Sequence, residues 1–229
     1  WKRFALKKYS FEMGKGLYTD MNAIRRDEIV DNIHSLYVDQ WDWEKVISKQ
    51  DRNLDYLKNT VRSIYKVIKS TTDSVREKYG LDKANLPDEI TFVTSQELED
   101  MYPTLTPSQR ENAAAKEYGA TFIMQIGGLL KSGNKHDGRA PDYDDWNLNG
   151  DIFVYNPAIE RGLELSSMGI RVDKDSMLAQ LKAENAMDRL SLPFHKALMN
   201  DELPLSIGGG IGKSRLCMFI LAKRHIGEV

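Results

Sequence analysis

The chain has 229 residues, and its 32 lysine and arginine residues are nearly balanced by 34 aspartate and glutamate residues. This length allows one large domain with a substantial core. The charge balance leaves no excess of basic residues to hold a nucleic-acid backbone. We therefore do not expect a nucleic-acid-binding protein. No apolar run approaches membrane-spanning length and no secretory leader is visible, so we do not expect a membrane protein either.

The chain contains a single cysteine, Cys217, which cannot form an internal disulfide bond. It lies on the apolar face of the segment after Arg215, where we expect a packed, reduced thiol rather than a nucleophile. A reduced thiol is typical of the cytoplasm, where we expect the protein. The chain begins at Trp1 without an initiator methionine, and we expect further segments before it and after Val229.

Two β-rich arms, Leu17–Ile24 and His34–Asp42, flank a charged segment at residues 25–28. This pattern predicts a long antiparallel hairpin with a polar tip. Alternation places Gln40 and Asp42 on the same face of the second arm. Two polar side chains on an otherwise apolar face indicate a lined pocket, although an exposed edge strand would show the same pattern.

The following segments alternate between helices and strands. Apolar residues at helical spacing predict an amphipathic helix over Asp51–Lys69, and a continuous apolar run predicts a buried strand over Ala120–Ile126. Caps and turns indicate the other elements. These are strands at Glu89–Thr94, Asp151–Tyr155 and Gly162–Val172, and helices at Gln96–Met101 with Ser95 as its cap, Thr106–Tyr118, Ser176–Asn185 and Pro193–Leu198.

A long polar loop is expected over Gly127–Asn149, and loops of this length tend to be functional or mobile. It contains His136 beside Asp137, but no second histidine or cysteine stands at ligand spacing. We therefore expect these two residues on the surface rather than in a metal site.

The strand over Gly162–Val172 carries Glu164 and Arg171, which are seven residues apart. Residues at odd spacing in a regular strand point to opposite faces. A bulge in the segment Ser166–Gly169 would reset the alternation and let both side chains point into one cleft.

A glycine-rich stretch near the end of the chain joins an apolar strand to an apolar helix that Arg215 opens. Its glycines, which include Gly209 and Gly210, would let a nucleotide approach the backbone closely. A P-loop is excluded because the first glycine of that motif would fall on Ile207, and a dinucleotide-binding fingerprint fails because its third glycine falls on Lys213 or Arg215.

Several motifs in this order resemble the class II aminoacyl-tRNA synthetase catalytic domain, in its aspartate and asparagine branch. The closest resemblance is to the ammonia-dependent asparagine synthetases of the A type, and it covers nearly the whole chain. It rests on Y-V-D-Q-W-D-W-E, A-P-D-Y-D-D-W, L-N-G-D, E-L-S-S-M-G-I-R-V-D and I-G-G-G-I-G-x-S-R-L. The resemblance implies one α+β domain over residues 1–229, with a central, mainly antiparallel sheet flanked by helices. It also implies a homodimer and a motif 1 region that precedes Trp1.

The implied activity is that of an ATP-dependent ligase, which converts aspartate and ammonia to asparagine through β-aspartyl-AMP and releases AMP and pyrophosphate. An aspartyl- or asparaginyl-tRNA synthetase is the alternative enzyme, but it predicts an anticodon-binding domain and a basic face. An inactive paralogue that serves as a binding module is the third reading. It predicts loss of charged site residues, yet all four of Arg25, Glu164, Arg171 and Arg215 are present.

The resemblance assigns the ATP site. The motif 2 arginine, which contacts the α-phosphate, is Arg25 or its neighbour Arg26, and we favour Arg25. Arg215 is expected at the terminal phosphate, because a guanidinium matches phosphate oxygens. Asp151 and Glu164 supply hard oxygen ligands for Mg²⁺ at the phosphates, with Gly209 and Gly210 below the nucleotide.

The second substrate, aspartate, needs partners for both its charged ends. Gln40 and Asp42, assisted by Ser167, are expected at its ammonium group, and Arg171 at the carboxylate that does not react. Ammonia requires a nearby carboxylate that attracts ammonium and takes a proton, and Asp144 is the candidate. No glutaminase-like cysteine nucleophile is recognisable, so free ammonia is the expected nitrogen donor.

Overall fold

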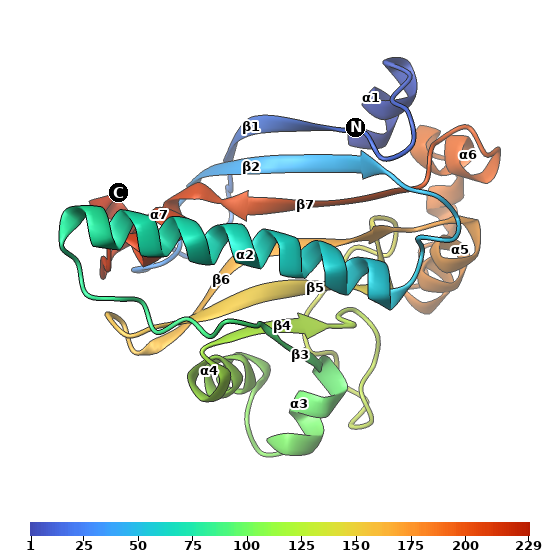
Figure 1. Ribbon diagram of the computed structural model, residues 1–229. Helices are drawn as coiled ribbons and strands as arrows, with labels where there is room; N and C mark the ends of the chain where they lie inside the picture. Colours follow the sequence, from blue (N-terminus) through green and yellow to red (C-terminus); the bar gives the residue numbers. More distant parts are fainter.

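A computed structural model describes residues 1–229 and shows a seven-stranded sheet flanked by helices (Figure 1). The strand order is β1-β2-β7-β6-β5-β4-β3, and every neighbouring pair is antiparallel except β3 and β4. The strands are β1 (Gly16–Ile24), β2 (Tyr37–Val46), β3 (Thr91–Thr94), β4 (Ala120–Met124), β5 (Asp144–Asn156), β6 (Arg161–Arg171) and β7 (Ser206–Gly212). The predicted α+β class with a mainly antiparallel sheet is confirmed.

Strands β1 and β2 form the predicted hairpin, with Gly16 opposite Lys45 and Ile24 opposite Tyr37. The second strand starts and ends later than predicted. Its outer neighbour is β1 and its inner neighbour is β7, so β1 is the edge strand and the edge alternative for the second arm is wrong.

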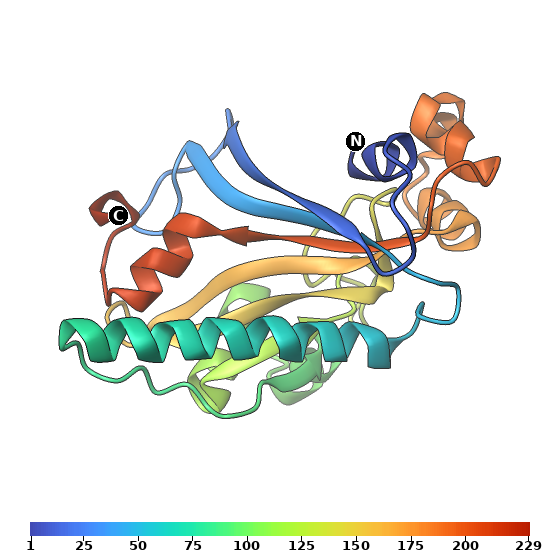
Figure 2. The ribbon, with the colours of Figure 1, turned by 45° about the horizontal axis from the view of Figure 1, so that its top comes forward.

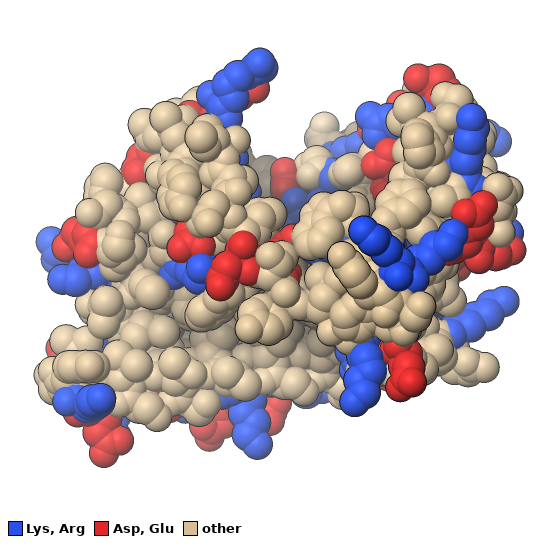
Figure 3. Space-filling model, turned by 90° about the horizontal axis from the view of Figure 1, so that it is seen from above, with Lys and Arg blue, Asp and Glu red and all other residues tan.

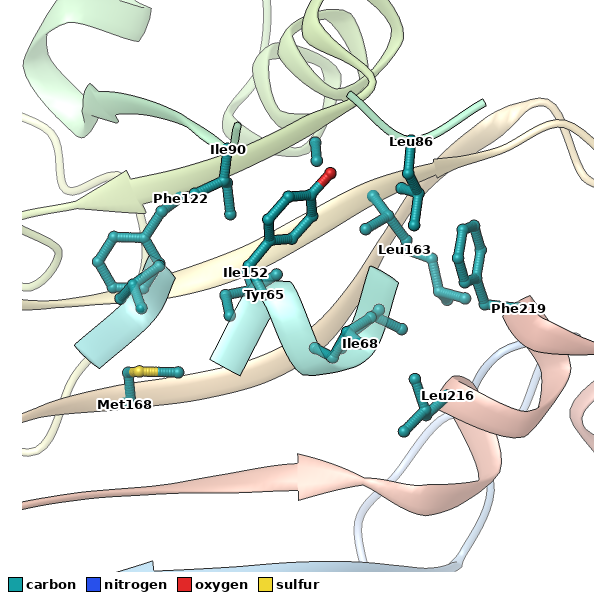
Figure 4. Packing of buried hydrophobic residues seen from close by; sticks show 14 of the residues in the cluster. Tyr65, Ile68, Leu86, Ile90, Phe122, Ile152, Leu163, Met168, Leu216 and Phe219 are labelled. Atoms are coloured by element: carbon teal, nitrogen blue, oxygen red, sulfur yellow. The ribbon is translucent and has the colours of Figure 1, made fainter. Parts of the chain in front are cut away.

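Helix α2 (Leu54–Tyr79) crosses one face of the sheet and is ten residues longer at its end than predicted (Figures 1 and 2). Asn53 caps its start by accepting a hydrogen bond from the Tyr56 amide, and Gly80 ends it in the left-handed conformation. Its apolar stripe packs on the sheet and on helix α7 (Lys213–Ile220). Figure 4 shows this core, in which Tyr65 and Ile68 of α2 face Ile152, Leu163 and Phe219.

The opposite face of the sheet is partly covered by α3 (Ser95–Met101) and α4 (Pro107–Tyr118), which pack at the β4 side. The start of α4 agrees with the prediction, with Thr106 as its cap. The predicted cap of α3 is wrong: the side chain of Thr94, not Ser95, accepts a hydrogen bond from the Glu97 amide. The Glu97 carboxylate in turn accepts one from the Thr94 amide, and the two bonds form a capping box.

The remaining helices gather at one end of the sheet (Figure 1). They are α1 (Lys2–Lys8), α5 (Lys174–Ala183) and α6 (Pro193–Met199), with a 3₁₀ turn at Met187–Ser191; a second 3₁₀ turn, Ile226–Glu228, lies near the carboxyl end of the chain. Helix α1 was not predicted. No helix in residues 1–229 has the length and apolar character needed to cross a membrane.

Two predictions about the middle of the chain need correction. Strand β5 begins at Asp144, so the polar loop is shorter than the predicted Gly127–Asn149. The bulge in β6 exists but lies at Leu165, because Ser166 pairs with Ile152 while Glu164 pairs with the next residue of β5, Phe153. One inserted residue is what brings Glu164 and Arg171 to the same side.

Candidate functional site

A cavity of about 260 Å³ lies on the sheet face that α2 does not cover. Trp43 and Met168 pack in the α2 core, so their strand neighbours Asp42 and Ser167 point to the other face. Figure 3, which views the molecule from above Figure 1, shows a hollow between two raised parts. Acidic and basic groups are interspersed on the face in view rather than gathered in one basic area.

Ten of the eleven predicted site residues line this one cavity, although they come from strands β2, β5, β6 and β7, from the loop after β1 and from helix α7. They are Arg25, Gln40, Asp42, Asp144, Glu164, Ser167, Arg171, Gly209, Gly210 and Arg215. Arg26 does not line it, and its side chain is exposed and paired with Asp27. The eleventh residue, Asp151, lines a neighbouring cavity that shares Glu164 and Arg215 with the first.

Strand β7 runs beneath the cavity and supplies its glycines. A Cβ atom on Gly210 would lie 2.8 Å from Gln40 Nε2, and one on Gly208 would lie 2.5 Å from Arg171 Nη2. Side chains at these positions would fill the space that polar groups from β2 and β6 now occupy. Gly209 faces the other way, where a Cβ atom would lie 2.6 Å from the Met168 Cβ.

Arg171 is fully buried and is held by two carboxylates. Its Nε and Nη2 atoms donate to Glu44 at 3.0 and 2.8 Å, and Nη1 donates to Asp144. Its guanidinium carbon lies 4.1 Å from the centre of the Tyr143 ring. These bonds use three of the five N–H donors of the side chain, which leaves two for a ligand in the cavity.

The two carboxylates respond differently to this environment. Burial opposes ionisation of Glu44, but Arg171 and Lys2 outweigh it and hold the pKa of Glu44 below its ordinary value. For Asp144, burial is stronger than the attraction of Arg171, and the pKa of Asp144 is raised. Asp144 therefore takes up a proton more readily than an ordinary aspartate does.

Lys2 is a site residue that sequence reasoning missed. Its buried ammonium group lies 3.1 Å from Asp42 Oδ2 and 3.6 Å from Glu44 Oε2. Lys2 and Arg171 thus face three carboxylates, those of Asp42, Glu44 and Asp144. This end of the cavity has an excess of negative charge, which favours an ammonium group.

The other end of the cavity carries Arg25 and Arg215. Arg25 Nη1 is 2.9 Å from Glu28 Oε2, and more than half of the Arg25 side chain is exposed. Arg215 is anchored, because Nε donates to the Ile33 carbonyl at 3.1 Å and Nη1 lies 3.3 Å from Glu164 Oε2. The exposed Arg25 guanidinium can therefore move toward a ligand, whereas the Arg215 guanidinium is held in position by its two contacts.

Asp151 and Glu164 fit a divalent cation. Asp151 Oδ1 is buried without a hydrogen-bond partner, although Ser167 is its cross-strand neighbour. Burial and then the charge of Glu164 raise the pKa of Asp151 to about 7, a repulsion that a cation would relieve. No three acidic, histidine or cysteine side chains are arranged as a complete ligand set, so phosphate or water oxygens would have to supply the rest.

Asp151 has a further partner that the sequence did not indicate. Arg139 forms an ion pair with Asp151 Oδ2 and a second one, 2.8 Å long, with Asp137. The guanidinium holds one carboxylate oxygen and leaves Oδ1 available.

Two expectations about single residues are wrong. His136 is buried rather than on the surface, and its Nε2 atom lies 3.0 Å from Glu111 Oε1 of helix α4. Cys217 is exposed, since the buried side of α7 is formed by Leu216 and the residues Met218–Ile220.

Glu44 could have been found from the sequence. It continues the alternation of Gln40 and Asp42 on β2, and it follows them in the same motif. Lys2 gave no such signal, because only the packing of α1 against β2 brings it to the site.

Comparison with known proteins gives a consistent result. A family model described as aspartate-ammonia ligase matches residues 1–229. Aspartate–ammonia ligase of Fusobacterium nucleatum is 64% identical over the whole chain, which covers 70% of that protein. The corresponding protein of Pediococcus pentosaceus is 62% identical, and the chain covers 68% of it.

Several solved structures with a similar fold are aspartyl- or asparaginyl-tRNA synthetases. The aspartyl-tRNA synthetase of Entamoeba histolytica matches 98% of the chain with a TM-score of 0.68 and 14% identity. An asparaginyl-tRNA synthetase of Pyrococcus horikoshii, complexed with asparaginyl-adenylate, matches 98% with a TM-score of 0.68 and 15% identity. The chain spans about half the length of these synthetase chains, and the likeness concerns the fold of their catalytic part.

Proposed function

The chain belongs to the aspartate–ammonia ligase family, and from this membership we propose how its cavity performs the ATP-dependent synthesis of asparagine. The reaction has two steps. The β-carboxylate of aspartate attacks the α-phosphorus of ATP, which forms β-aspartyl-AMP and releases pyrophosphate. Ammonia then attacks the acyl carbon, the bond to AMP breaks, and one proton leaves the new amide nitrogen.

The nucleotide lies over β7, between Arg25 and Arg215. Arg25 contacts the α-phosphate and Arg215 the terminal phosphate, where fixed positive charge offsets the charge that develops during adenylation. The partly exposed position of Arg25 and the anchored position of Arg215 support these roles. Asp151 and Glu164 would hold Mg²⁺, which when bound neutralises phosphate charge.

Aspartate occupies the end of the cavity near Arg171. The side-chain oxygens of Gln40, Asp42 and Ser167 accept hydrogen bonds from its ammonium group. The two remaining N–H donors of Arg171 bind its α-carboxylate. This orientation directs the β-carboxylate toward the nucleotide. Glu44 supports the orientation, because it holds the Arg171 guanidinium in place from the opposite side.

Asp144 receives the proton that ammonia loses. Its raised pKa makes it a stronger base than an ordinary aspartate, and the excess of carboxylates around it attracts ammonium. The single observation that carries the whole proposal is that Arg25, Arg171 and Arg215, distant in sequence, line one cavity with Asp144.

The test uses purified full-length protein with aspartate, ATP, Mg²⁺ and ¹⁵N-labelled ammonium. We expect equal amounts of AMP, pyrophosphate and asparagine, with the label in the side-chain amide. Asp144→Asn should reduce ammonia-dependent turnover by about 100-fold while formation of the adenylate continues. ADP as the product, or a requirement for tRNA, would overturn the proposal.

The matched control is Asp142→Asn, two residues earlier in the same segment. Asp142 binds Arg189 and His195 and does not line the cavity. Equal losses in the two variants would mean that Asp144 acts only through the structure of this segment.

A further inference from the structure

Arg52 is an arginine outside the cavity whose contacts meet at the strand ends that carry Asp144 and Arg171. It lies in the loop between β2 and α2, which passes beside the start of α5 at one end of the sheet (Figures 1 and 2). Only 8% of its side chain is exposed, and it does not line the cavity. The mechanism described above gives this residue no part.

The Arg52 guanidinium joins three segments of the chain. Nη2 donates to Asp145 Oδ2 at 2.9 Å, Nε lies 3.0 Å from Asp173 Oδ2, and Nη1 donates to the main-chain carbonyl of Arg171. Asp145 follows Asp144 at the start of β5, while Asp173 lies just after the end of β6 and caps α5. The fixed fork of a guanidinium can hold these three partners at once, which a lysine ammonium cannot do.

Regular sheet pairing leaves the start of β5 weakly fixed. Asp144 pairs with Arg171, but the next residue of β5 that has a partner in β6 is Asn149. The residues between them, 145–148, are unpaired on this side, and β4 pairs with β5 only at residues 150–154. The backbone that follows Asp144 therefore depends on side-chain contacts for its position.

Two buried side chains supply these contacts. Gln180 of α5 donates from Nε2 to the Asp144 carbonyl at 3.0 Å and so holds the main chain. Arg52 holds the Asp145 side chain and links it to the Arg171 carbonyl. Because the Asp144 carboxylate accepts a hydrogen bond from Arg171 Nη1, this link controls the separation of the two site residues.

Arg52 also neutralises two neighbouring carboxylates. The side chains of Asp145 and Asp173 are 8% and 33% exposed, and neither forms an ion pair with any other cation. Loss of the guanidinium would leave two like charges side by side in a poorly hydrated place. Asp145 would then move toward water, and the adjoining Asp144 would move with it.

We propose that Arg52 is a positioning residue that holds Asp144 and Arg171 at the separation required for the reaction with ammonia. The proposal rests on the function given above, in which Asp144 takes up a proton and Arg171 binds aspartate. Arg52 touches neither substrate and acts through Asp145 and the Arg171 carbonyl. A displacement of about 1 Å in a reacting group can slow a reaction roughly 100-fold, so a residue of this kind has a large effect on rate.

The test compares Arg52→Lys and Asp145→Asn with wild-type full-length protein. Assays with ATP, aspartate and ammonium give kcat and the KM of each substrate, and aspartate-dependent exchange of labelled pyrophosphate into ATP reports adenylate formation. We expect each variant to form asparagine roughly 100-fold more slowly, with a higher KM for aspartate. The KM for ATP should stay unchanged, and exchange should fall by less than about tenfold, because the nucleotide end of the cavity is untouched.

The double variant shows whether Arg52 and Asp145 act through one link. If they do, Arg52→Lys combined with Asp145→Asn loses about as much activity as either single variant. Losses that multiply in the double variant would show that the two residues act separately, and they would contradict the proposal.

Arg110→Lys is the matched control. The side chain of Arg110 is also 8% exposed and also contacts a carboxylate, that of Glu99, and a main-chain carbonyl, that of Tyr102, but it does not line the cavity. Its replacement should lower the free energy of unfolding as Arg52→Lys does, while the kinetic constants stay at wild-type values. An equal loss of turnover in Arg110→Lys would mean that Arg52 acts only through general stability. If Arg52→Lys does not fold, Asp145→Asn tests the proposal alone.

The outcomes separate the two proposals. Wild-type protein that makes no asparagine contradicts the proposed function. Wild-type protein that makes asparagine, while the folded Arg52→Lys and Asp145→Asn variants keep wild-type turnover and KM values, contradicts only the role of Arg52.

Discussion

Arg171 and Glu44 form the most deeply buried ion pair of the site. A guanidinium removed from water is costly unless its hydrogen bonds are satisfied, and Glu44 and Asp144 satisfy three of them. The pair therefore sets the position of Arg171 before any substrate arrives. Ser206 in turn donates to Glu44 Oε1 at 2.6 Å, which holds the carboxylate itself.

Glu44→Gln should lower the free energy of unfolding by about 3 kcal/mol near pH 7. The folded-state pKa of Glu44 lies below its ordinary value of 4.5. Its charge therefore stabilises the fold above that value, and the stabilisation is lost as the pH falls through the lower folded-state pKa. The difference between wild type and variant should shrink below about pH 4.5. Urea unfolding at several pH values measures it, and a pH-independent difference would contradict the assigned role.

At the scale of elements, β7 decides what the cavity can hold. The strand pairs with β2 on one side and β6 on the other, so polar side chains from both neighbours meet above it. Because β7 has glycines at these positions, the side chains of its neighbours can lie directly over its backbone, as the Glu44–Arg171 ion pair does over Gly208. The bulge at Leu165 in β6 then brings Glu164 to the same side as Arg171.

Gly208→Ala should break the ion pair above β7. Its added Cβ would lie 2.5 Å from Arg171 Nη2 and closer still to Glu44, so one of the two side chains has to move. We expect a loss of about 3 kcal/mol in unfolding free energy and a higher KM for aspartate. Gly212→Ala in the same strand meets nothing within 4 Å and should change stability by less than about 0.5 kcal/mol. Similar unfolding curves for the two variants would refute this view of β7.

At the scale of the whole molecule, one apolar layer supports the site. The largest core cluster joins α2 and α7 to strands β4, β5, β6 and β7, with Trp43 of β2 and Phe92 of β3 packed against it, and it lies directly beneath the cavity floor. Smaller clusters pack under α3 and α4 and beneath α5 and α6. Because the large cluster contacts most strands, we expect the sheet to unfold as a unit.

Leu163→Ala tests this expectation. The side chain is fully buried in the large cluster, and its truncation should cost about 3 kcal/mol. Tryptophan fluorescence and far-ultraviolet circular dichroism should shift together, because both report one transition. Val67→Ala on the exposed side of α2 should shift neither. Separate transitions in the two signals would show that parts of the chain unfold independently.

Much of the fold was determined by local sequence patterns. Alternation predicted the hairpin, helical spacing predicted α2, and Thr106 with Pro107 marked the start of α4. These signals depend on neighbours in the chain, which is why they can be read without coordinates. The ends of elements were less accurate, since they depend on caps such as Asn53 and Gly80 and on packing.

The charged residues of the site were also recognisable in the sequence, because the motifs that contain them have specific composition and spacing. Their partners were decided by tertiary structure alone. Lys2 reaches Asp42 only because α1 packs on β2, and Arg139 reaches Asp151 only through the course of the polar loop. Contacts between distant segments depend on how the sheet orders its strands, and no local pattern in the sequence specifies that order.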